Sequence, residues 1–119
     1  MDNIIATKSF DFALNIINLY KEISIFHKEY VLSKQILKSG TSIGANVREA
    51  LRAQSKKDFV SKMYIALKEA EETQYWLQLL IKSNYLDEQR GNSLLLECTT
   101  ISKILTSIIK TTQKNLTIQ

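Results

Sequence analysis

Residues 39–50 read SGTSIGANVREA, a stretch that places two glycines four residues apart within a run of helical periodicity. Glycine inside a helix costs about 1 kcal/mol relative to alanine, so Gly40 and Gly44 need a compensating role. The close approach of a neighbouring backbone is such a role, because a larger side chain would prevent it. The stretch therefore predicts a tight helix-packing surface.

The sequence on both sides of the glycines continues the same helix, which we expect over residues 29–54. Its apolar residues advance in steps of three and four, as in the seam of a coiled coil. The predicted seam consists of Leu32, Ile36, Gly40, Ile43, Val47 and Ala50.

Three further helices are expected over residues 7–25, 56–83 and 87–113. Ser55 is placed to cap the third helix, with Asp58 three positions on, and Asp87 is placed to cap the fourth. The first helix carries two adjacent apolar stripes, one through Phe10 and Leu14 and one through Phe12 and Ile16. An apolar face this wide predicts contact with two surfaces.

The composition is typical of an all-α protein, since the 119 residues include no proline and three glycines. Helix connections of two to eight residues place consecutive helices antiparallel. We therefore expect a single domain over residues 1–119, folded as an antiparallel up-down-up-down four-helix bundle.

The single cysteine, Cys98, cannot form an internal disulfide and lies in an apolar stripe of the fourth helix. There it is expected to act as a small buried hydrophobe, which favours a reducing, cytoplasmic location. No run of about 20 apolar residues occurs, so neither secretion nor membrane insertion is expected.

Two segments resemble the four-helix-bundle family of 23S rRNA intervening-sequence proteins. They are residues 35–50, QILKSGTSIGANVREA, and residues 55–80, SKKDFVSKMYIALKEAEETQYWLQLL. The most specific parts are SIGAN-x-x-EA and A-L-K-E-A-x-E-T, and the resemblance covers nearly the whole chain. The sequence departs from many relatives at Phe26-His27, where they have Phe-Pro.

The resemblance implies a homopentamer with a basic surface. The similar accessory variability determinant of diversity-generating retroelements binds a reverse transcriptase and RNA, so a protein partner of that kind is also implied, although what most members do is unknown. The shared segments include Glu49 and Glu72. A buried carboxylate needs a cation or hydrogen-bond donors, such as Arg48, Arg52 or Asn46, so we interpret Asn46, Glu49 and Glu72 as structural polar residues.

Positive charge is concentrated in one part of the chain. Residues 28–62 contain eight basic and three acidic residues, a net of +5, whereas the remainder sums to −1. Several of the basic residues share a face of the second helix that is ~33 Å long at ~1.5 Å per residue. The stripe consists of Lys34, Lys38, Arg48, Arg52 and Lys56. Lys57 adjoins it.

Such a stripe predicts RNA or DNA binding through phosphates, with weak sequence specificity. We expect no exposed aromatic platform among the basic residues. A solvated helix face that keeps the bundle soluble explains the same pattern, and both interpretations stay open at this point.

The residues favour a protein without catalytic, cofactor or metal sites. His27 is the single histidine and has no partner identifiable from spacing, and one Cys with one His cannot supply a structural zinc site. Glu69 and Glu72 are three apart, but the Glu-x-x-His motif of carboxylate-bridged metal bundles is absent. Tyr75 and Trp76 are expected to be core or interface anchors.

Two functions are therefore compatible with the sequence. One is a non-enzymatic oligomer that holds RNA or a ribonucleoprotein on its basic helix faces. The other is an assembly or adaptor protein that binds a protein partner, with the basic charge serving solubility or steering.

Overall fold

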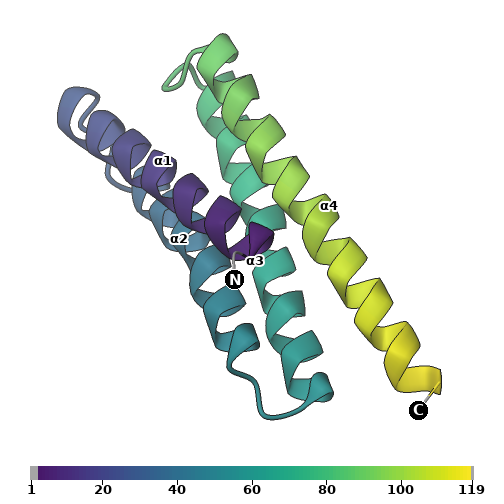
Figure 1. The fold of residues 1–119 in the computed structure, drawn as a ribbon. Coiled ribbons are helices and arrows are strands. Elements are labelled where there is room, and N and C mark those ends of the chain that lie inside the picture. The colour runs from purple at the N-terminus through teal and green to yellow at the C-terminus, as the bar shows by residue number, and fades with distance from the viewer. Residues whose placement is uncertain (1–2, 119) are drawn as a thin grey trace.

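The computed structural model describes residues 3–118, and these residues form four helices and no strand. The helices are α1 (Ile4–Phe26), α2 (Leu32–Leu51), α3 (Lys56–Lys82) and α4 (Glu88–Ile118). Each packs against the next along the chain, and α1 also contacts α4. The predicted all-α four-helix bundle is confirmed (Figure 1).

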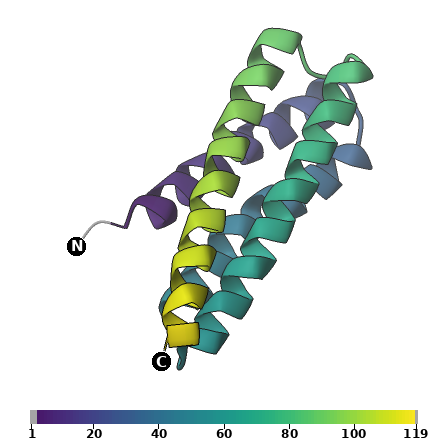
Figure 2. The ribbon, with the colours of Figure 1, turned by 90° about the vertical axis from the view of Figure 1, so that its right-hand side faces the viewer.

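Contacts between the helices establish their directions. Thr73 of α3 meets Ser39 of α2, whereas Lys62, nearer the start of α3, meets Glu49, nearer the end of α2. Residue numbers that rise along α3 are therefore matched by residue numbers that fall along α2, so the two helices are antiparallel. In Figure 2, α1 runs obliquely to α4, and the C-terminal turns of α4 extend beyond the N-terminus of α1 alongside α3.

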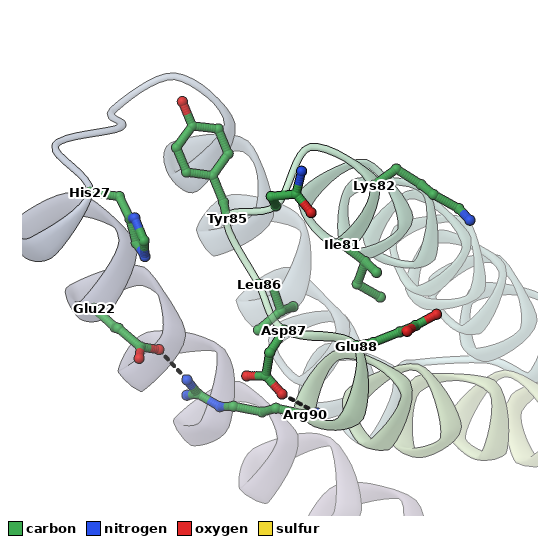
Figure 3. Close-up of a pocket in the computed structure, with 10 residues that line it drawn as sticks. Glu22, His27, Ile81, Lys82, Tyr85, Leu86, Asp87, Glu88 and Arg90 are labelled. Atoms are coloured by element: carbon green, nitrogen blue, oxygen red, sulfur yellow. Dashed lines mark hydrogen bonds and ion pairs between the residues drawn. The ribbon is translucent and has the colours of Figure 1, made fainter.

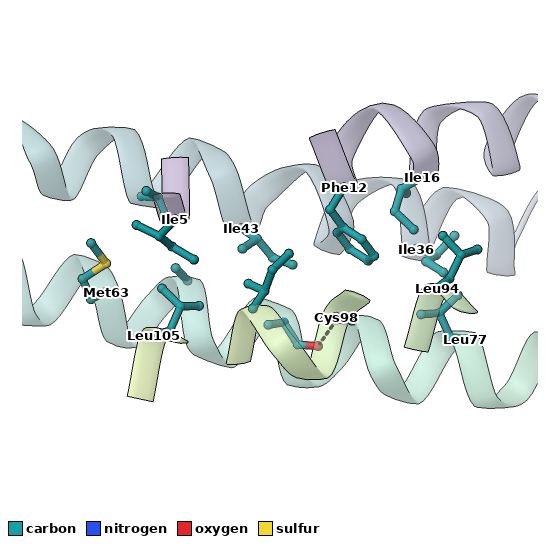
Figure 4. Close-up of a cluster of buried hydrophobic side chains, with 14 of the residues drawn as sticks. Ile5, Phe12, Ile16, Ile36, Ile43, Met63, Leu77, Leu94, Cys98 and Leu105 are labelled. Carbon is teal, nitrogen blue, oxygen red and sulfur yellow. Dashed lines mark hydrogen bonds between the residues drawn. The ribbon is translucent and has the colours of Figure 1, made fainter. Parts of the chain in front are cut away.

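The core is a continuous set of aliphatic side chains from all four helices (Figure 4). Phe12, Ile16, Ile43, Leu77 and Leu105 are fully buried within it, which is the outcome expected for apolar stripes at helical spacing. The predicted seam of α2 is buried from Ile36 to Ala50, with Leu32 partly buried at its start.

Cys98 belongs to this core, as predicted. Its thiol donates a hydrogen bond of 3.2 Å to the carbonyl oxygen of Ala70 on α3. Burial raises the pKa of the Cys98 thiol to about 12, so the thiolate is scarce at neutral pH.

The two glycines of α2 face α1 at close range. A Cβ atom on Gly40 would lie 2.8 Å from Cγ2 of Ile16, which is closer than two non-bonded carbon atoms can approach. A Cβ on Gly44 would lie 3.4 Å from the backbone oxygen of Ser9, an ordinary contact distance that leaves no room for a longer side chain. Close helix approach therefore requires glycine at position 40, whereas position 44 has room for a methyl group and for nothing longer.

The start of α2 lies three residues later than expected. Glu29, which was expected inside the helix, instead accepts hydrogen bonds from the backbone N–H groups of Val31, Leu32 and Ser33, at 3.1, 2.9 and 2.8 Å. These are donors that a helix N-terminus leaves unpaired, so the carboxylate caps α2 from outside it. Burial disfavours the charged form of Glu29, but the three donors outweigh it and hold its pKa below the ordinary value.

Other helix ends also differ from expectation. The helix expected to reach residue 54 ends at Leu51, and α4 continues to Ile118 rather than 113. Asn3 accepts a hydrogen bond of 3.0 Å from the N–H of Ala6. This cap lets α1 begin at Ile4, three residues before the expected start at residue 7. The caps at Ser55 and Asp87 form as predicted, accepting from the N–H groups of Asp58 and Arg90.

The apolar stripe of α1 through Phe10 and Leu14 remains at the surface of the chain. Phe10 and Leu14 are 48% and 47% exposed, while the stripe through Phe12 and Ile16 is buried.

Within the described residues, no helix is long and apolar enough to cross a membrane.

We expect the two replacements Gly44→Leu and Gly44→Ala to have different effects on the free energy of unfolding. Leucine would clash with the Ser9 backbone and should lower the free energy of unfolding by ~1–3 kcal/mol or more. Alanine fits at 3.4 Å and gains up to about 1 kcal/mol of helix propensity, so it should be neutral or stabilising. Urea denaturation measures both, and a Gly44→Leu protein as stable as the parent would contradict the close-packing explanation.

We also expect Glu29→Ala to destabilise the protein by about 1 kcal/mol at pH 7, the usual cost of losing a helix cap. A carboxyl whose pKa is lowered by folding adds stability above its unfolded pKa, and that stability is lost as pH falls through the folded pKa. The difference between the variant and the parent in urea denaturation should therefore shrink below about pH 4. A difference that stays constant from pH 7 to pH 3 would exclude the charged cap.

Candidate nucleic-acid interface

The structure divides the predicted basic stripe into two parts. Because α2 ends at Leu51, Arg52 caps that helix and Lys56 is the first residue of α3. The expected single stripe along one helix face, from Lys34 to Lys56, is therefore wrong. Arg48, Arg52, Lys56 and Lys57 instead gather around the turn between α2 and α3, and all four are exposed.

Local hydrogen bonds give this turn a defined shape. The N–H of Arg52 donates to the carbonyl oxygen of Glu49 at 3.1 Å, and that of Ala53 to the carbonyl oxygen of Ala50 at 3.0 Å. Ser55 then caps α3 by accepting from the N–H of Asp58 at 3.1 Å. Arg48 and Arg52 complement the negative end of the α2 dipole, whereas Lys56 and Lys57 oppose the positive end of the α3 dipole. These two lysines therefore do not contribute to helix stability through the dipole.

The acidic residues near this end do little to offset the charge. Glu49 is exposed and lies 3.8 Å from the ammonium of Lys62, so its charge is shared with a residue outside the turn. Arg48 lies over the ring of Phe10 on α1, 5.3 Å from the centroid, and not against a carboxylate. Asp58 is the remaining acid, in the first turn of α3. We call the surface of Arg48, Arg52, Lys56 and Lys57 the basic end.

Lys34 and Lys38 lie further along α2 in a more mixed environment. Lys38 is close enough to the partly buried Glu69 to lower its pKa, but burial and the neighbouring charge of Glu72 raise the pKa of Glu69 overall. Lys34 and Lys38 are both exposed, but Lys38 has the carboxylate of Glu69 on α3 nearby. The middle of α2 therefore has a weaker positive field than the basic end.

The structural polar residues are placed differently from expectation. Glu49 and Glu72 are exposed, so their predicted burial is wrong for this chain, although Glu49 does lie near a cation, Lys62. Asn46 is half-buried, and its side-chain amide donates to the carbonyl oxygen of Ser42 at 2.8 Å, within its own helix.

A second group of basic residues was missed by the sequence analysis. Lys103, Lys110 and Lys114 are exposed on the C-terminal half of α4. The side chain of Gln113 donates to the Tyr64 hydroxyl at 3.4 Å, which places this part of α4 beside the first half of α3. A signal was present, because no acid follows Glu97 in the sequence.

Exposed aromatic rings also lie among the basic residues, contrary to expectation. Lys57, Tyr64, Lys68 and Tyr75 follow one another at spacings that place them on one face of α3, and all are exposed. Tyr75 packs edge-on against Trp76, with ring centroids 5.2 Å apart, and Trp76 is packed against the core. Trp76 thus acts as the core anchor, while Tyr64 and Tyr75 face solvent.

The opposite end of the bundle holds a cavity of about 640 Å³ between the end of α1 and the turn that joins α3 to α4 (Figure 3). The imidazole of His27 packs edge-on against Tyr85, 5.7 Å between centroids, and Arg90 forms an ion pair with Glu22. Carboxylates and cations are mixed here, so the cavity has no strong charge preference. Among the described residues, no group of three or more His, Cys, Asp or Glu side chains is placed to hold a metal ion.

The fold and this surface define a class: small antiparallel four-helix bundles with a basic end. Residues 1–107 match the model of the family described as 23S rRNA-intervening sequence protein. The chain therefore belongs to this family.

One solved structure with a high likeness is a protein of unknown function from the S23 ribosomal protein family of Bacteroides thetaiotaomicron. It is 55% identical in sequence, with a TM-score of 0.88, and the match covers 89% of this chain and 98% of that one. No match was found among functionally curated proteins.

Proposed function

We propose that this protein is a non-enzymatic, cytoplasmic, oligomeric helical bundle that associates with RNA or a ribonucleoprotein through phosphate contacts. The observation that carries the proposal is the basic end, where four exposed cations surround one turn. Lys56 and Lys57 stand at a helix N-terminus, where their charge opposes the dipole, so local stability does not account for them. Phosphate binding does account for them.

Assembly strengthens this proposal. The exposed Phe10 and Leu14 on α1 form an apolar stripe that a second copy of the chain would cover. The family resemblance favours five copies, in which a formal charge of +4 per chain, taken five times, would reach about +20. Five copies of the basic end would then act together on one nucleic acid.

The same apolar stripe supports the alternative, an adaptor that binds a protein partner such as a reverse transcriptase. In that case the basic charge serves solubility or steering, and affinity depends on apolar burial. The two functions differ in salt dependence, because phosphate contacts weaken steeply as salt rises and apolar contacts do not.

We expect the protein to be a homo-oligomer, with five copies, at micromolar concentration. Leu14→Glu should reduce the assembly by placing a charge in the apolar stripe, while Gln78→Glu adds the same charge at an exposed position of α3 and should not. Light scattering gives the mass, and circular dichroism verifies the helicity of both variants. A monomeric parent protein would contradict the assembly.

We expect the triple replacement of Arg52, Lys56 and Lys57 by glutamine to lower affinity for two unrelated RNA hairpins to a similar extent. The slope of log K against log salt should flatten by up to about one unit for each phosphate that the variant no longer binds. The control triple replaces Lys21, Lys28 and Lys82, which are exposed lysines at the opposite end of the bundle, and removes the same charge. Fluorescence anisotropy measures both.

Either of two results would contradict the RNA proposal. One is a parent protein that binds neither hairpin at low salt. The other is equal binding by both triple variants with unchanged salt slopes, which would make the basic end a solvated surface and favour the adaptor.

A further inference from the structure

The face formed by α3 and α4 contains an open groove of about 630 Å³ that the proposed function does not yet use. Its α4 side presents the cations Lys103 and Lys110, and its α3 side contributes one acid, Glu71. Neither lysine forms an ion pair with the residues that the structure describes. The groove therefore has an excess of positive charge.

Hydroxyl groups add uncommitted donors to the groove. Ser107, one turn before Lys110, and Thr111, the residue directly after it, both line the groove, and their hydroxyls form no hydrogen bond with the described part of the chain. Lys103, Ser107, Lys110 and Lys114 advance in steps of four, three and four, so they share one face of α4 over ~16 Å. A row of ammonium and hydroxyl donors is chemically matched to a row of phosphates.

Tyr64 lies at the end of the groove nearest the basic end. It stands one helical turn before Leu67, which lines the groove, and its hydroxyl is contacted by Gln113 across the seam between α3 and α4. Its side chain is 47% exposed, with Lys57 and Lys68 on the same face of α3. An aromatic ring among cations, beside a groove with phosphate donors, is the combination that binds single-stranded nucleic acid.

The geometry points to the groove between α3 and α4 as a binding site for single-stranded RNA. Phosphates contact Lys103, Lys110 and the Ser107 and Thr111 hydroxyls, and one unpaired base stacks on Tyr64. This inference rests on the proposed RNA association and specifies the form of RNA that is bound. A duplex would gain the phosphate contacts but not the stacking, because its bases are already paired and stacked.

The experiment compares a 20-nucleotide oligo(U) with a blunt 20-base-pair RNA duplex, using fluorescence anisotropy at one salt concentration. Tyr64→Ala should weaken oligo(U) binding at least about fivefold, the lower end of the effect of removing one stacked base, and change duplex binding less than twofold. Tyr64→Phe keeps the ring and should restore binding. Tyr30→Ala is the matched control, because Tyr30 is 53% exposed in the turn at the other end of the bundle.

A second variant tests the groove without altering the ring. Lys103→Gln with Lys110→Gln should flatten the oligo(U) salt slope by about 0.7 units for each single-strand phosphate that the variant no longer binds, while the control pair Lys21→Gln and Lys82→Gln should not. Light scattering on Tyr64→Ala verifies that assembly is unchanged.

Each failure has a distinct pattern. If the parent binds hairpins but Tyr64→Ala binds oligo(U) as the parent does, the stacking site is overturned and the RNA proposal stands. Equal affinity of the parent for oligo(U) and duplex also overturns the inference, as does a loss of oligo(U) binding that accompanies a changed oligomer mass, because Tyr64 would then be an assembly residue. If no RNA of any form is bound, the proposed function fails together with the inference.

Discussion

The structure depends on the close contact between α1 and α2 at Gly40 and Gly44. The absence of side chains on these residues lets Ile16 and the Ser9 backbone of α1 approach α2 directly. Ser9 is fully buried there, and its hydroxyl donates to the carbonyl oxygen of Ala6 at 3.2 Å, so a polar side chain is accommodated without an unpaired donor. This contact determines where α1 lies on the bundle. Since α1 then crosses α4 obliquely, the last turns of α4 extend beyond α1 alongside α3 (Figure 2).

Helical periodicity was sufficient to predict the fold, because the core stripes are a repeating property of the sequence. Helix ends depend on single hydrogen bonds and were less predictable. Glu29 has good helix propensity, yet its carboxylate lies outside α2 and caps it. Gly91 stands in the first turn of α4, where its low helix propensity is unfavourable, but it admits the side chain of Ile81 from α3, where a Cβ would collide. The reason for that glycine lies in a contact between two helices, which no local pattern reveals.

The candidate site was predictable in composition but not in arrangement. The excess of positive charge in residues 28–62 was visible, whereas the pairs that reduce it join different helices, as Glu49 does with Lys62 and Glu69 with Lys38. Counting charge along the chain treats all cations alike. Packing distinguishes Lys56 and Lys57, which form no ion pair among the described residues, from Lys38, which lies near Glu69 of α3. It also brings Lys110 and Lys114 of α4 to the end of α3 that carries Tyr64. The contact between Gln113 and Tyr64, which are 49 positions apart in the sequence, establishes this placement.

The order of the helices around the bundle separates the two kinds of surface. Contacts run from α1 to α2, α3 and α4 in turn, so the face formed by α1 and α2 lies opposite the face formed by α3 and α4. Phe10 lies against Arg48 of α2, which places the exposed apolar stripe on the first face, while Lys103, Lys110 and Tyr64 belong to the second. Copies of the chain that assemble through α1 would therefore leave the α3 and α4 groove open.

Arg48 lies where the apolar stripe meets the basic end, and its guanidinium can remain on the Phe10 ring while its charge adds to the field of Arg52. The proposed assembly surface and the proposed groove for nucleic acid thus consist of different residues, so a substitution in one is expected to leave the other intact.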